Sequence, residues 1–416
     1  MKFLIQYGRI RWKRRDLNMM VIMFLVQFIL LCPEGLTHTS VISCIRILQT
    51  AMFVIALGIV ALRYLNDKFV WVNLAFFITL TLATIRADFN LSTLMLYISR
   101  SIGVVVFYYF ASQINYLLLW RCLSDYFATI ALINTILTLI SPDGLFLETS
   151  VNNIEVSYYL LGNSNQVIPF YIIGIAVSII YYKLTGKKRG RGLFLYLQAL
   201  VCNLIYGSAT SLIMLFVFVV LSLFLYKNKA LIHWKKWIAF VGVVGTFVCY
   251  YAILVLNIQV FFAGIIENVL HKDVTLSTRV IIWNEAFRLI QNSPLLGYGT
   301  STRRLITFGN TSFDAHNIVL QILLMGGMVL LVFLILIIWV AFKNWLNCKD
   351  SVRMIGLIMF ITFAIGSLAE VYVFTYIFAI LTIIYLLGQY RDNTCCKSHS
   401  IYMYDIQYDG KGYLRY

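Results

Sequence analysis

The sequence predicts an all-α polytopic integral membrane protein with about twelve transmembrane helices. Of the 416 residues, 61% are hydrophobic and 12% are charged, and the mean hydropathy is +0.85. A soluble domain needs more polar residues than this to cover its surface. The net charge of +16 arises mainly in short loops between apolar runs, as in membrane proteins, so we predict no nucleic-acid partner.

Twelve apolar runs are long enough to cross a bilayer. Most of the 33 basic residues lie in the segments that are cytoplasmic if the N-terminus is inside, so both termini are predicted to be cytoplasmic. We interpret 193–226 as a pair of spans hinged at Gly207-Ser208, although one long tilted helix is the alternative. The predicted spans are residues 17–32, 41–62, 69–85, 94–112, 118–140, 165–182, 193–207, 210–226, 238–256, 318–342, 354–370 and 372–388.

These spans divide the chain into four parts. Residues 1–256 hold helices 1–9 with a minor outer loop at 141–164, and the basic N-terminus reads as an uncleaved first span. Residues 257–317 form one long extracytoplasmic loop between helices 9 and 10. Residues 318–390 hold helices 10–12, and residues 391–416 form a cytoplasmic tail.

The long loop contains the stretch STRVIIWNEAFRLIQNSPLLGYGT, which begins at Ser277. Ser277 or Thr278 is placed to cap a helix, and Pro294 is placed to stop it. One stripe of this helix carries Arg279, Trp283 and further apolar residues at helical spacing. The simplest interpretation is an amphipathic helix lying at the outer membrane interface.

Five cations lie in this loop, on the side that the topology otherwise keeps poor in basic residues. Such a concentration predicts an anionic ligand, and a guanidinium binds phosphate by bidentate hydrogen bonds. The available anions are the pyrophosphate of a lipid-linked substrate and, as the alternative, a phospholipid headgroup. The cations are Lys272, Arg279, Arg288, Arg303 and Arg304.

His316 lies at the end of the loop, just before the tenth predicted span. A histidine titrates near neutral pH and takes protons from hydroxyl groups, and Asp314 is a candidate to orient the ring. A structural role is the alternative. Asn317 is placed to cap the next helix, and Glu370, in a short outer turn, is placed either to pair with an arginine or to face solvent.

Three further arginines lie within or beside apolar runs, where a cation needs a partner or water. Arg86 is predicted to pair with Asp88, whereas Arg46 and Arg100 are candidates for the site or for a buried ion pair. The eight cysteines show no disulfide or metal spacing, and the chain has no D-x-D pair or Walker loop. We therefore predict no metal and no cofactor.

Two blocks of the chain resemble the O-antigen ligase and polymerase family, Wzy-type proteins included. They are R-x3-W-x2-A-F-x2-I-x3-P-L-L-G-Y-G, from Arg279 to Gly299, and H-N-x2-L-Q-x4-G-G, from His316 to Gly327. The run GNSNQ (162–166) also resembles a family block. The chain departs from the family at Ala209, where many members have an arginine.

The resemblance implies a glycosyltransferase in the bacterial cytoplasmic membrane. It would polymerise O-antigen or capsule repeat units carried on undecaprenyl pyrophosphate, which are both donor and acceptor, without a metal. Membrane lipid, a chain-length regulator and a flippase are implied partners. Arg279 and His316 would be catalytic, and the substrate-binding candidates are Arg303, Arg304, Trp283, Asn317, Arg288, Arg46, Arg86, Arg100 and Glu370.

Three alternatives remain open from the sequence. A ligase would transfer the glycan to a lipid A core, and no residue distinguishes it from a polymerase. A flippase would also be a basic twelve-span protein, but its expected repeat halves are not found. A non-enzymatic scaffold would leave the charges of the long loop without a function.

Overall fold

The computed structural model describes residues 5–7, 10–12, 14–87, 90–149, 155–226, 235–254, 279–308, 311–346, 352–389, 407–408 and 414–415. These residues are mostly helical, and every predicted apolar run overlaps a helix. Six helices are long and apolar enough to cross a membrane, and six shorter apolar helices accompany them among the described residues. The all-α membrane fold is confirmed, whereas the number of spans and the extent of the long loop stay predictions.

The helices follow the chain in the order predicted from hydropathy. Helices long enough to span are α2 (Val41–Arg63), α3 (Lys68–Ala87), α4 (Leu91–Ile114), α5 (Tyr116–Ile140), α6 (Ile168–Thr185) and α12 (Ile318–Leu346). The shorter apolar helices are α1 (Arg14–Leu30), α7 (Arg191–Tyr206), α8 (Ala209–Leu221), α9 (Lys235–Leu254), α13 (Arg353–Gly366) and α14 (Phe374–Gln389). The amphipathic helix α11 covers Arg279–Asn292, and single turns form η1 (Glu34–His38), η2 (Ser222–Tyr226) and η5 (Gly299–Arg304).

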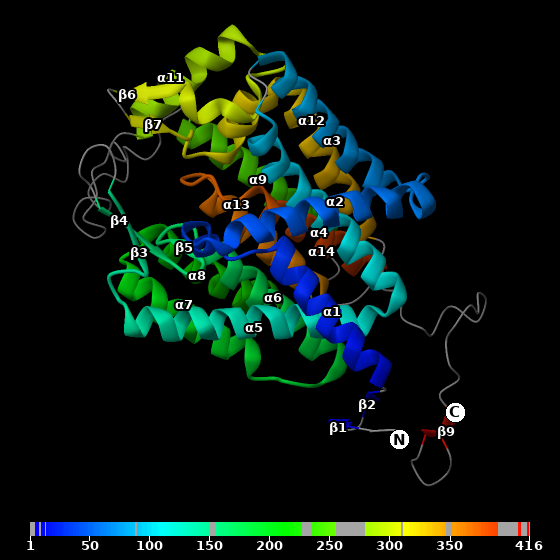
Figure 1. The fold of residues 1–416 in the computed structure, drawn as a ribbon. Coiled ribbons are helices and arrows are strands. Elements are labelled where there is room, and N and C mark those ends of the chain that lie inside the picture. Colours follow the sequence, from blue (N-terminus) through cyan, green and yellow to red (C-terminus); the bar gives the residue numbers. More distant parts are fainter. Residues whose placement is uncertain are drawn as a thin grey trace.

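Short antiparallel strands complete the described part of the chain. One sheet joins β3 (Phe146–Thr149), β4 (Glu155–Tyr159) and β5 (Gly162–Asn163), and another joins β6 (Ile306–Phe308) to β7 (Thr311–Phe313). In Figure 1 these strands lie on one side of the helices, opposite the two chain termini. Two terminal pairs are β1 (Ile5–Tyr7) with β2 (Ile10–Trp12) and β8 (Gln407–Tyr408) with β9 (Leu414–Arg415).

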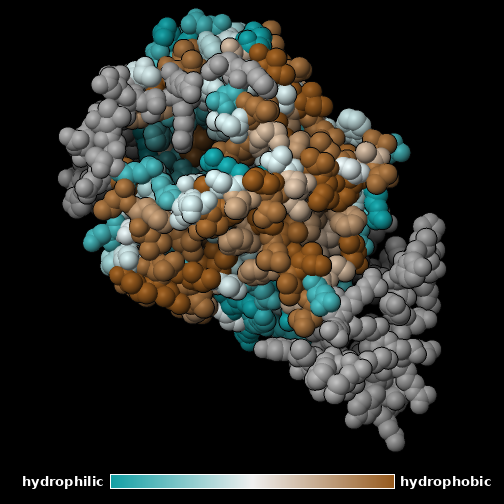
Figure 2. Space-filling view, in the orientation of Figure 1, coloured by the Kyte–Doolittle hydropathy of each residue, from teal (hydrophilic) through white to brown (hydrophobic). Residues whose placement is uncertain are grey.

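Helix α14 forms the centre of the bundle. Nearly all of its side chains are buried, and it contacts α4, α12 and α13. Helix α2 lies at the periphery, since only 22% of its most apolar 18-residue stretch is buried inside the protein. The outer surfaces of the helices form the broad hydrophobic area of Figure 2, as expected for faces that contact lipid.

The break between α7 and α8 lies where the sequence predicts a hinge. Gly207 ends α7 with a φ of 63°, and the Ser208 side chain accepts a hydrogen bond from the N–H of Ser211 at the start of α8. Glycine readily adopts the left-handed backbone conformation that ends many helices, and serine is a favoured N-cap residue. The predicted pair of helices is therefore confirmed, and the interpretation as one long helix is wrong.

Helix α12 is interrupted within a run that the sequence predicts as one continuous span. Gly326 and Gly327 have non-helical backbone angles, and φ of Gly327 is 62°. The first half of α12 is therefore a short helix, Ile318–Met325, whose N-terminus adjoins His316. Where a membrane helix is broken, the backbone N–H and C=O groups at the break need other hydrogen-bond partners. The turn that follows α11 supplies them.

Candidate active site

The turn after α11 supplies the partners for the break in α12. The N–H of Met328 donates to the carbonyl of Pro294 at 2.8 Å, and the N–H of Tyr298 donates to the carbonyl of Leu324 at 2.7 Å. The two sequence blocks that suggested the family thus form one interlocked backbone structure. These hydrogen bonds fix the position of α11 relative to the start of α12.

Glycines allow this close backbone contact. A Cβ atom on Gly297, whose φ is 59°, would lie 2.5 Å from the Leu324 carbonyl oxygen, and one on Gly327 would overlap the backbone of Leu295. Only a residue without a side chain fits at either position. The glycines of PLLGYG and of the GG pair are therefore explained by packing.

Arg86 holds the same turn from α3. Its Nη2 donates to the Ser293 hydroxyl at 2.8 Å and to the Gly297 carbonyl at 2.9 Å. The predicted partner Asp88 lies outside the described residues. Arg86 therefore fastens α3 to the turn that supports the site, and it does not join the Arg279 cluster described below.

The buried face of α11 packs on α12 and β6. It presents Ile282, Trp283 and Ala286 to Leu320 and Leu324. Trp283, one of the predicted substrate-binding residues, is only 2% exposed, so in this structure it packs between helices and does not face a ligand. The apolar stripe faces protein instead of membrane, which also corrects the interpretation of α11 as a helix lying flat at the interface.

The cap predicted at Asn317 is confirmed. Its side-chain oxygen accepts the N–H groups of Val319 and Leu320, and its amide nitrogen donates to the Leu368 carbonyl at 3.0 Å. Asn317, one of the predicted substrate-binding residues, is fully buried, and in this structure it positions the chain. Through Leu368 it fixes the α13–α14 turn beside His316.

His316 occupies the junction between β7 and α12 with a φ of 44°. This left-handed conformation is uncommon for a residue with a side chain and costs about 1–3 kcal/mol. The surrounding hydrogen bonds hold it, because the N–H of the preceding Ala315 donates to Gln321, whose amide donates to Thr302. The side chain of His316 remains 33% exposed.

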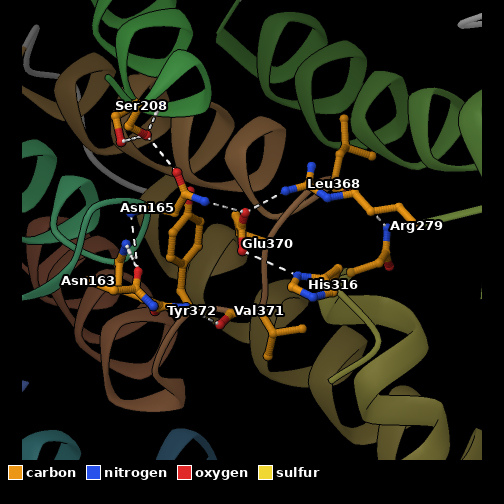
Figure 3. Close-up of polar contacts among 12 residues, drawn as sticks. Asn163, Asn165, Ser208, Arg279, His316, Leu368, Glu370, Val371 and Tyr372 are labelled. Atoms are coloured by element: carbon orange, nitrogen blue, oxygen red, sulfur yellow. Dashed lines mark hydrogen bonds and ion pairs between the residues drawn. The ribbon is translucent and has the colours of Figure 1, made fainter. Parts of the chain in front are cut away.

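Glu370 lies at the centre of the cluster, in the turn between α13 and α14 (Figure 3). Its Oε1 accepts a hydrogen bond from Nη2 of Arg279 at 2.6 Å, and its Oε2 lies 3.5 Å from Nδ1 of His316. The residue is 4% exposed. Of the two roles that the sequence left open for it, the structure shows the ion pair.

The turn between β5 and α6 supplies a third contact to Glu370. Nδ2 of Asn165 donates to Oε1 of the glutamate at 3.0 Å, and Oδ1 of Asn165 accepts from the Ser208 hydroxyl at 2.8 Å. The Asn163 side chain accepts the N–H groups of Asn165 and Gln166, which fixes this turn before α6. The GNSNQ block and the α7–α8 hinge thereby reach the same carboxylate as Arg279 and His316 (Figure 3).

Uncharged side chains next to Glu370 hold the backbone around it. The amide of Gln166 donates to the Val371 carbonyl at 3.0 Å, and the hydroxyl of Tyr372 donates to the sulfur of Met214 at 3.2 Å.

The other predicted arginines lie elsewhere. Arg100 is buried and donates hydrogen bonds to the carbonyls of Leu30 and Cys32 at the end of α1. These backbone contacts account for a cation within this apolar run, and no bound ligand is needed to explain it. Arg46 is exposed on α2, and neither arginine joins the Glu370 cluster of the described residues. The prediction that membrane-embedded arginines complete a phosphate site is not supported by their positions.

Arg288 lies on the exposed side of α11. It donates two hydrogen bonds to Glu285, and these lower the pKa of that carboxyl. Its side chain is 62% exposed and pairs with Glu285, whereas Arg279 on the same helix pairs with Glu370. Arg303 and Arg304 lie in η5, and their side chains, like Lys272, are outside the described part of the structure.

The cluster lies near a hollow on the strand-bearing side of the molecule. Figure 2 shows a depression with hydrophilic walls on this side, and in Figure 1 the turn between α13 and α14 reaches the same region, between β6–β7 and β3–β5. Among the described residues, no group of three His, Cys, Asp or Glu side chains is placed to hold a metal. The site offers a cation, an imidazole and a carboxylate to an incoming ligand.

An apolar cavity lies next to this cluster, between α9, α12 and α13. Its lining includes Phe247, Tyr250 and Phe363, together with Ile318 and Ser367. The N–H of Ile318 donates to the Ser367 carbonyl at 3.1 Å, two residues after His316 and three before Glu370. Apolar surface therefore begins directly where the polar cluster ends.

The comparison with protein families identifies one match. Residues 193–335 match the family model described as O-antigen ligase, a range that contains α11, both blocks of the interlock, Arg279 and His316. The predicted resemblance to the O-antigen ligase and polymerase family is thus confirmed over this range, and the match indicates a function of that type. The comparison with curated proteins gives no match.

Proposed function

We propose that this chain is a glycosyltransferase that polymerises oligosaccharide repeat units carried on undecaprenyl pyrophosphate at the outer face of the cytoplasmic membrane. The observation that carries the proposal is the convergence of Arg279, His316 and Glu370, at 2.6 Å and 3.5 Å, from three separate segments of the chain. The family match supports the reaction type.

The proposed reaction forms one glycosidic bond and breaks one phosphate ester bond. An acceptor hydroxyl oxygen attacks the anomeric carbon of the donor sugar, and the bond from that carbon to the pyrophosphate oxygen breaks. The hydroxyl proton passes to Nε2 of His316, and the electron pair leaves with the pyrophosphate. No external energy source is required, because the pyrophosphate is already an activated leaving group.

Each cluster residue has a role in this scheme. Arg279 offsets the charge that develops on the leaving pyrophosphate, as a guanidinium does well. Glu370 faces Nδ1 of His316, so Nδ1 carries the proton and Nε2 is free to accept one. The distance of 3.5 Å is long for a hydrogen bond, and we expect it to shorten when substrate fills the site.

The apolar cavity supports a lipid-linked donor. Phe247 is 39% exposed on the outer surface of α9, whereas Ile318 and Ser367 connect the cavity to the polar cluster. In this proposal the isoprene units next to the pyrophosphate lie at this cavity, beside the polar cluster. The same arrangement gives no reason for a water-soluble nucleotide sugar as donor.

Substitutions of Arg279 on α11 and of His316 before α12 test the proposal. Arg279→Ala and His316→Ala should each abolish the ladder of polymer on gels from cells that lack the native protein, at equal protein level. Arg288→Ala is the matched control, since it removes the same charge from the exposed side of the same helix. Full-length polymer from both site variants would overturn the proposal, and unchanged activity in EDTA is expected.

A ligase is the second candidate, because the matching family model is described as O-antigen ligase. The two activities differ in the acceptor alone. Purified protein given only lipid-linked repeat units should produce longer lipid-linked chains if it is a polymerase. Product that forms only after lipid A core is added would assign the ligase activity.

A further inference from the structure

A buried asparagine lies inside α5, a helix that the sequence predicts to cross the membrane. Asn134 is about six residues, or roughly 9 Å of helix, before the end of α5 at Ile140. Its side chain is 0% exposed. A polar amide in such a place costs free energy unless its donors and its acceptor are hydrogen-bonded. Its contacts therefore show why an amide occupies this position.

The side chain of Asn134 joins three other segments of the chain. Its Oδ1 accepts a hydrogen bond at 3.2 Å from the N–H of Leu161, between β4 and β5. Its Nδ2 donates to the hydroxyl of Tyr206, at the end of α7, at 2.9 Å and to that of Tyr171, in α6, at 3.2 Å. In Figure 1, α5, α6 and α7 lie together, with the β3–β5 sheet at the end of α5. One amide thus connects α5 to the sheet and to two neighbouring helices.

Neighbouring side chains hold the two tyrosines in place. The Tyr206 hydroxyl lies 2.7 Å from the Thr138 hydroxyl, and its ring packs on that of Tyr159 in β4 with the centroids 3.9 Å apart. The Tyr171 hydroxyl lies 3.2 Å from Oγ1 of Thr135. Hydrogen bonds and a ring contact therefore support the same connection between α5, β4 and the end of α7.

The segments held by this amide lead to the two partners of one hydrogen bond in the candidate site. Leu161 precedes Asn165 by four residues, and Tyr206 precedes Ser208 by two. The Ser208 hydroxyl donates to Oδ1 of Asn165 at 2.8 Å, and Nδ2 of Asn165 donates to Glu370 at 3.0 Å (Figure 3). The amide in α5 therefore fixes both sides of the contact that reaches the Glu370 carboxylate.

The three hydrogen bonds require the chemistry of asparagine. A carboxamide accepts from a backbone N–H and donates two hydrogen bonds at the same time. Leucine has a similar shape and can do neither, although it would cost less inside a membrane. Aspartate offers no donor to the tyrosines and would place a charge within the membrane. The presence of Asn134 is therefore explained by the segments that it connects.

We propose that Asn134 is a positioning residue for the reaction, an inference that rests on the proposed function. It holds the turn of Asn165 and the hinge at Ser208 at one fixed separation, so that Asn165 stays on Oε1 of Glu370. The other oxygen of that carboxylate then remains directed at Nδ1 of His316. Loss of the amide lets the turn and the hinge move apart, which lowers the turnover number while the groups that contact substrate are retained.

The kinetics of polymer formation by the purified full-length protein test this role. Asn134→Ala should lower kcat about tenfold and change KM by less than about twofold, since displaced catalytic groups act mainly on the chemical step. The double variant Asn134→Ala with Asn165→Ala should have the kcat of Asn165→Ala alone, because the first residue acts through the second. Losses that multiply in the double variant would overturn the proposal.

Two further variants separate positioning from a general loss of stability. Tyr206→Phe keeps the ring on Tyr159 and removes the hydroxyl that Asn134 binds, so it should lower kcat about threefold, again without adding to the effect of Asn165→Ala. This variant decides the question if Asn134→Ala does not fold. Asn203→Ala is the matched control, since Asn203 is a buried asparagine that donates to the Ala199 carbonyl of its own helix. Its kcat should match wild type, and an equal loss there would overturn the proposal.

Hydrogen exchange without substrate separates this inference from the proposed function. Residues 161–166 and 206–208 should exchange about tenfold faster in Asn134→Ala and at the wild-type rate in Asn203→Ala. Unchanged exchange in Asn134→Ala would overturn the positioning role. Faster exchange in a protein whose wild type forms no polymer would overturn the proposed function and the kinetic consequence with it, whereas the anchoring of the turn by Asn134 would stand.

Discussion

The carboxylate of Glu370 lies 3.5 Å from Nδ1 of His316, a contact between residues that are 54 positions apart in the chain. The sequence offered the nearby Asp314 as the group that orients this imidazole. In the structure the carboxylate next to the imidazole is that of Glu370, and the same carboxylate also forms an ion pair with Arg279. The glutamate is therefore shared by both proposed catalytic side chains.

Replacing Glu370 by glutamine should lower the turnover number by roughly 100-fold with a smaller change in KM. The neutral amide no longer stabilises the imidazolium that forms during catalysis, a role worth about two to four powers of ten for general base systems. Polymer formation by purified protein at several donor concentrations measures this. Asp314→Asn is the control, and an equal loss there would assign the orienting role to Asp314.

Replacing Asn165 by aspartate should reduce activity strongly. Its Nδ2 donates to Glu370 at 3.0 Å, so the substitution places two carboxylates together and removes a donor. One of them must then take up a proton or move away, and activity should recover partly as the pH falls. A pH profile measures this recovery, with Ser208→Ala as the uncharged control. A loss of activity that is equal at every pH would contradict the explanation by charge.

Alanine at Gly297 or Gly327 should prevent stable folding or lower the unfolding temperature markedly. Each alanine needs a left-handed backbone and overlaps the facing backbone of the interlock, at a cost of at least about 1–3 kcal/mol. Thermal unfolding in detergent measures the effect. Gly58→Ala is the matched control, since a Cβ there meets nothing within 4 Å; its unfolding temperature should stay the same or rise.

Replacing Arg86 by alanine should loosen the turn after α11 without directly removing a phosphate ligand. The Gly297 carbonyl and the Ser293 hydroxyl both lose a charged donor, which costs about 1–3 kcal/mol. Hydrogen exchange of residues 293–300 should become faster, and activity should fall. Arg288→Ala should change neither. Unchanged exchange with a large rise in KM would instead return Arg86 to the substrate site.

The sequence predicted the features that depend on local pattern. Hydrophobic runs located the helices, Pro294 and Asn317 marked a helix end and a helix start, and Gly207 marked the hinge between α7 and α8. Arg279 and His316 were predicted to share a site, and the structure brings both to Glu370. Their catalytic roles stay predictions.

The contacts between distant segments were not predictable from one sequence. Asn165 and Ser208 were seen only as a family block and a hinge, because nothing in their spacing indicates that they meet at Glu370. Trp283 was predicted to bind substrate, whereas the structure buries it, because helical periodicity shows which side chains share a face but not what covers that face. Arg86 and Arg100 satisfy backbone carbonyls, a requirement that appears only once the ends of other helices are in place.

The ion pair between Arg279 and Glu370 has a consequence for substrate exchange. The guanidinium already pairs with a carboxylate of the protein, so under the proposed function an incoming pyrophosphate would compete with Glu370 for Arg279. The net affinity for the pyrophosphate would then be the difference between two similar interactions. After sugar transfer, the return of Glu370 to Arg279 would favour departure of the lipid pyrophosphate, so release of product would not depend on breaking a tight complex.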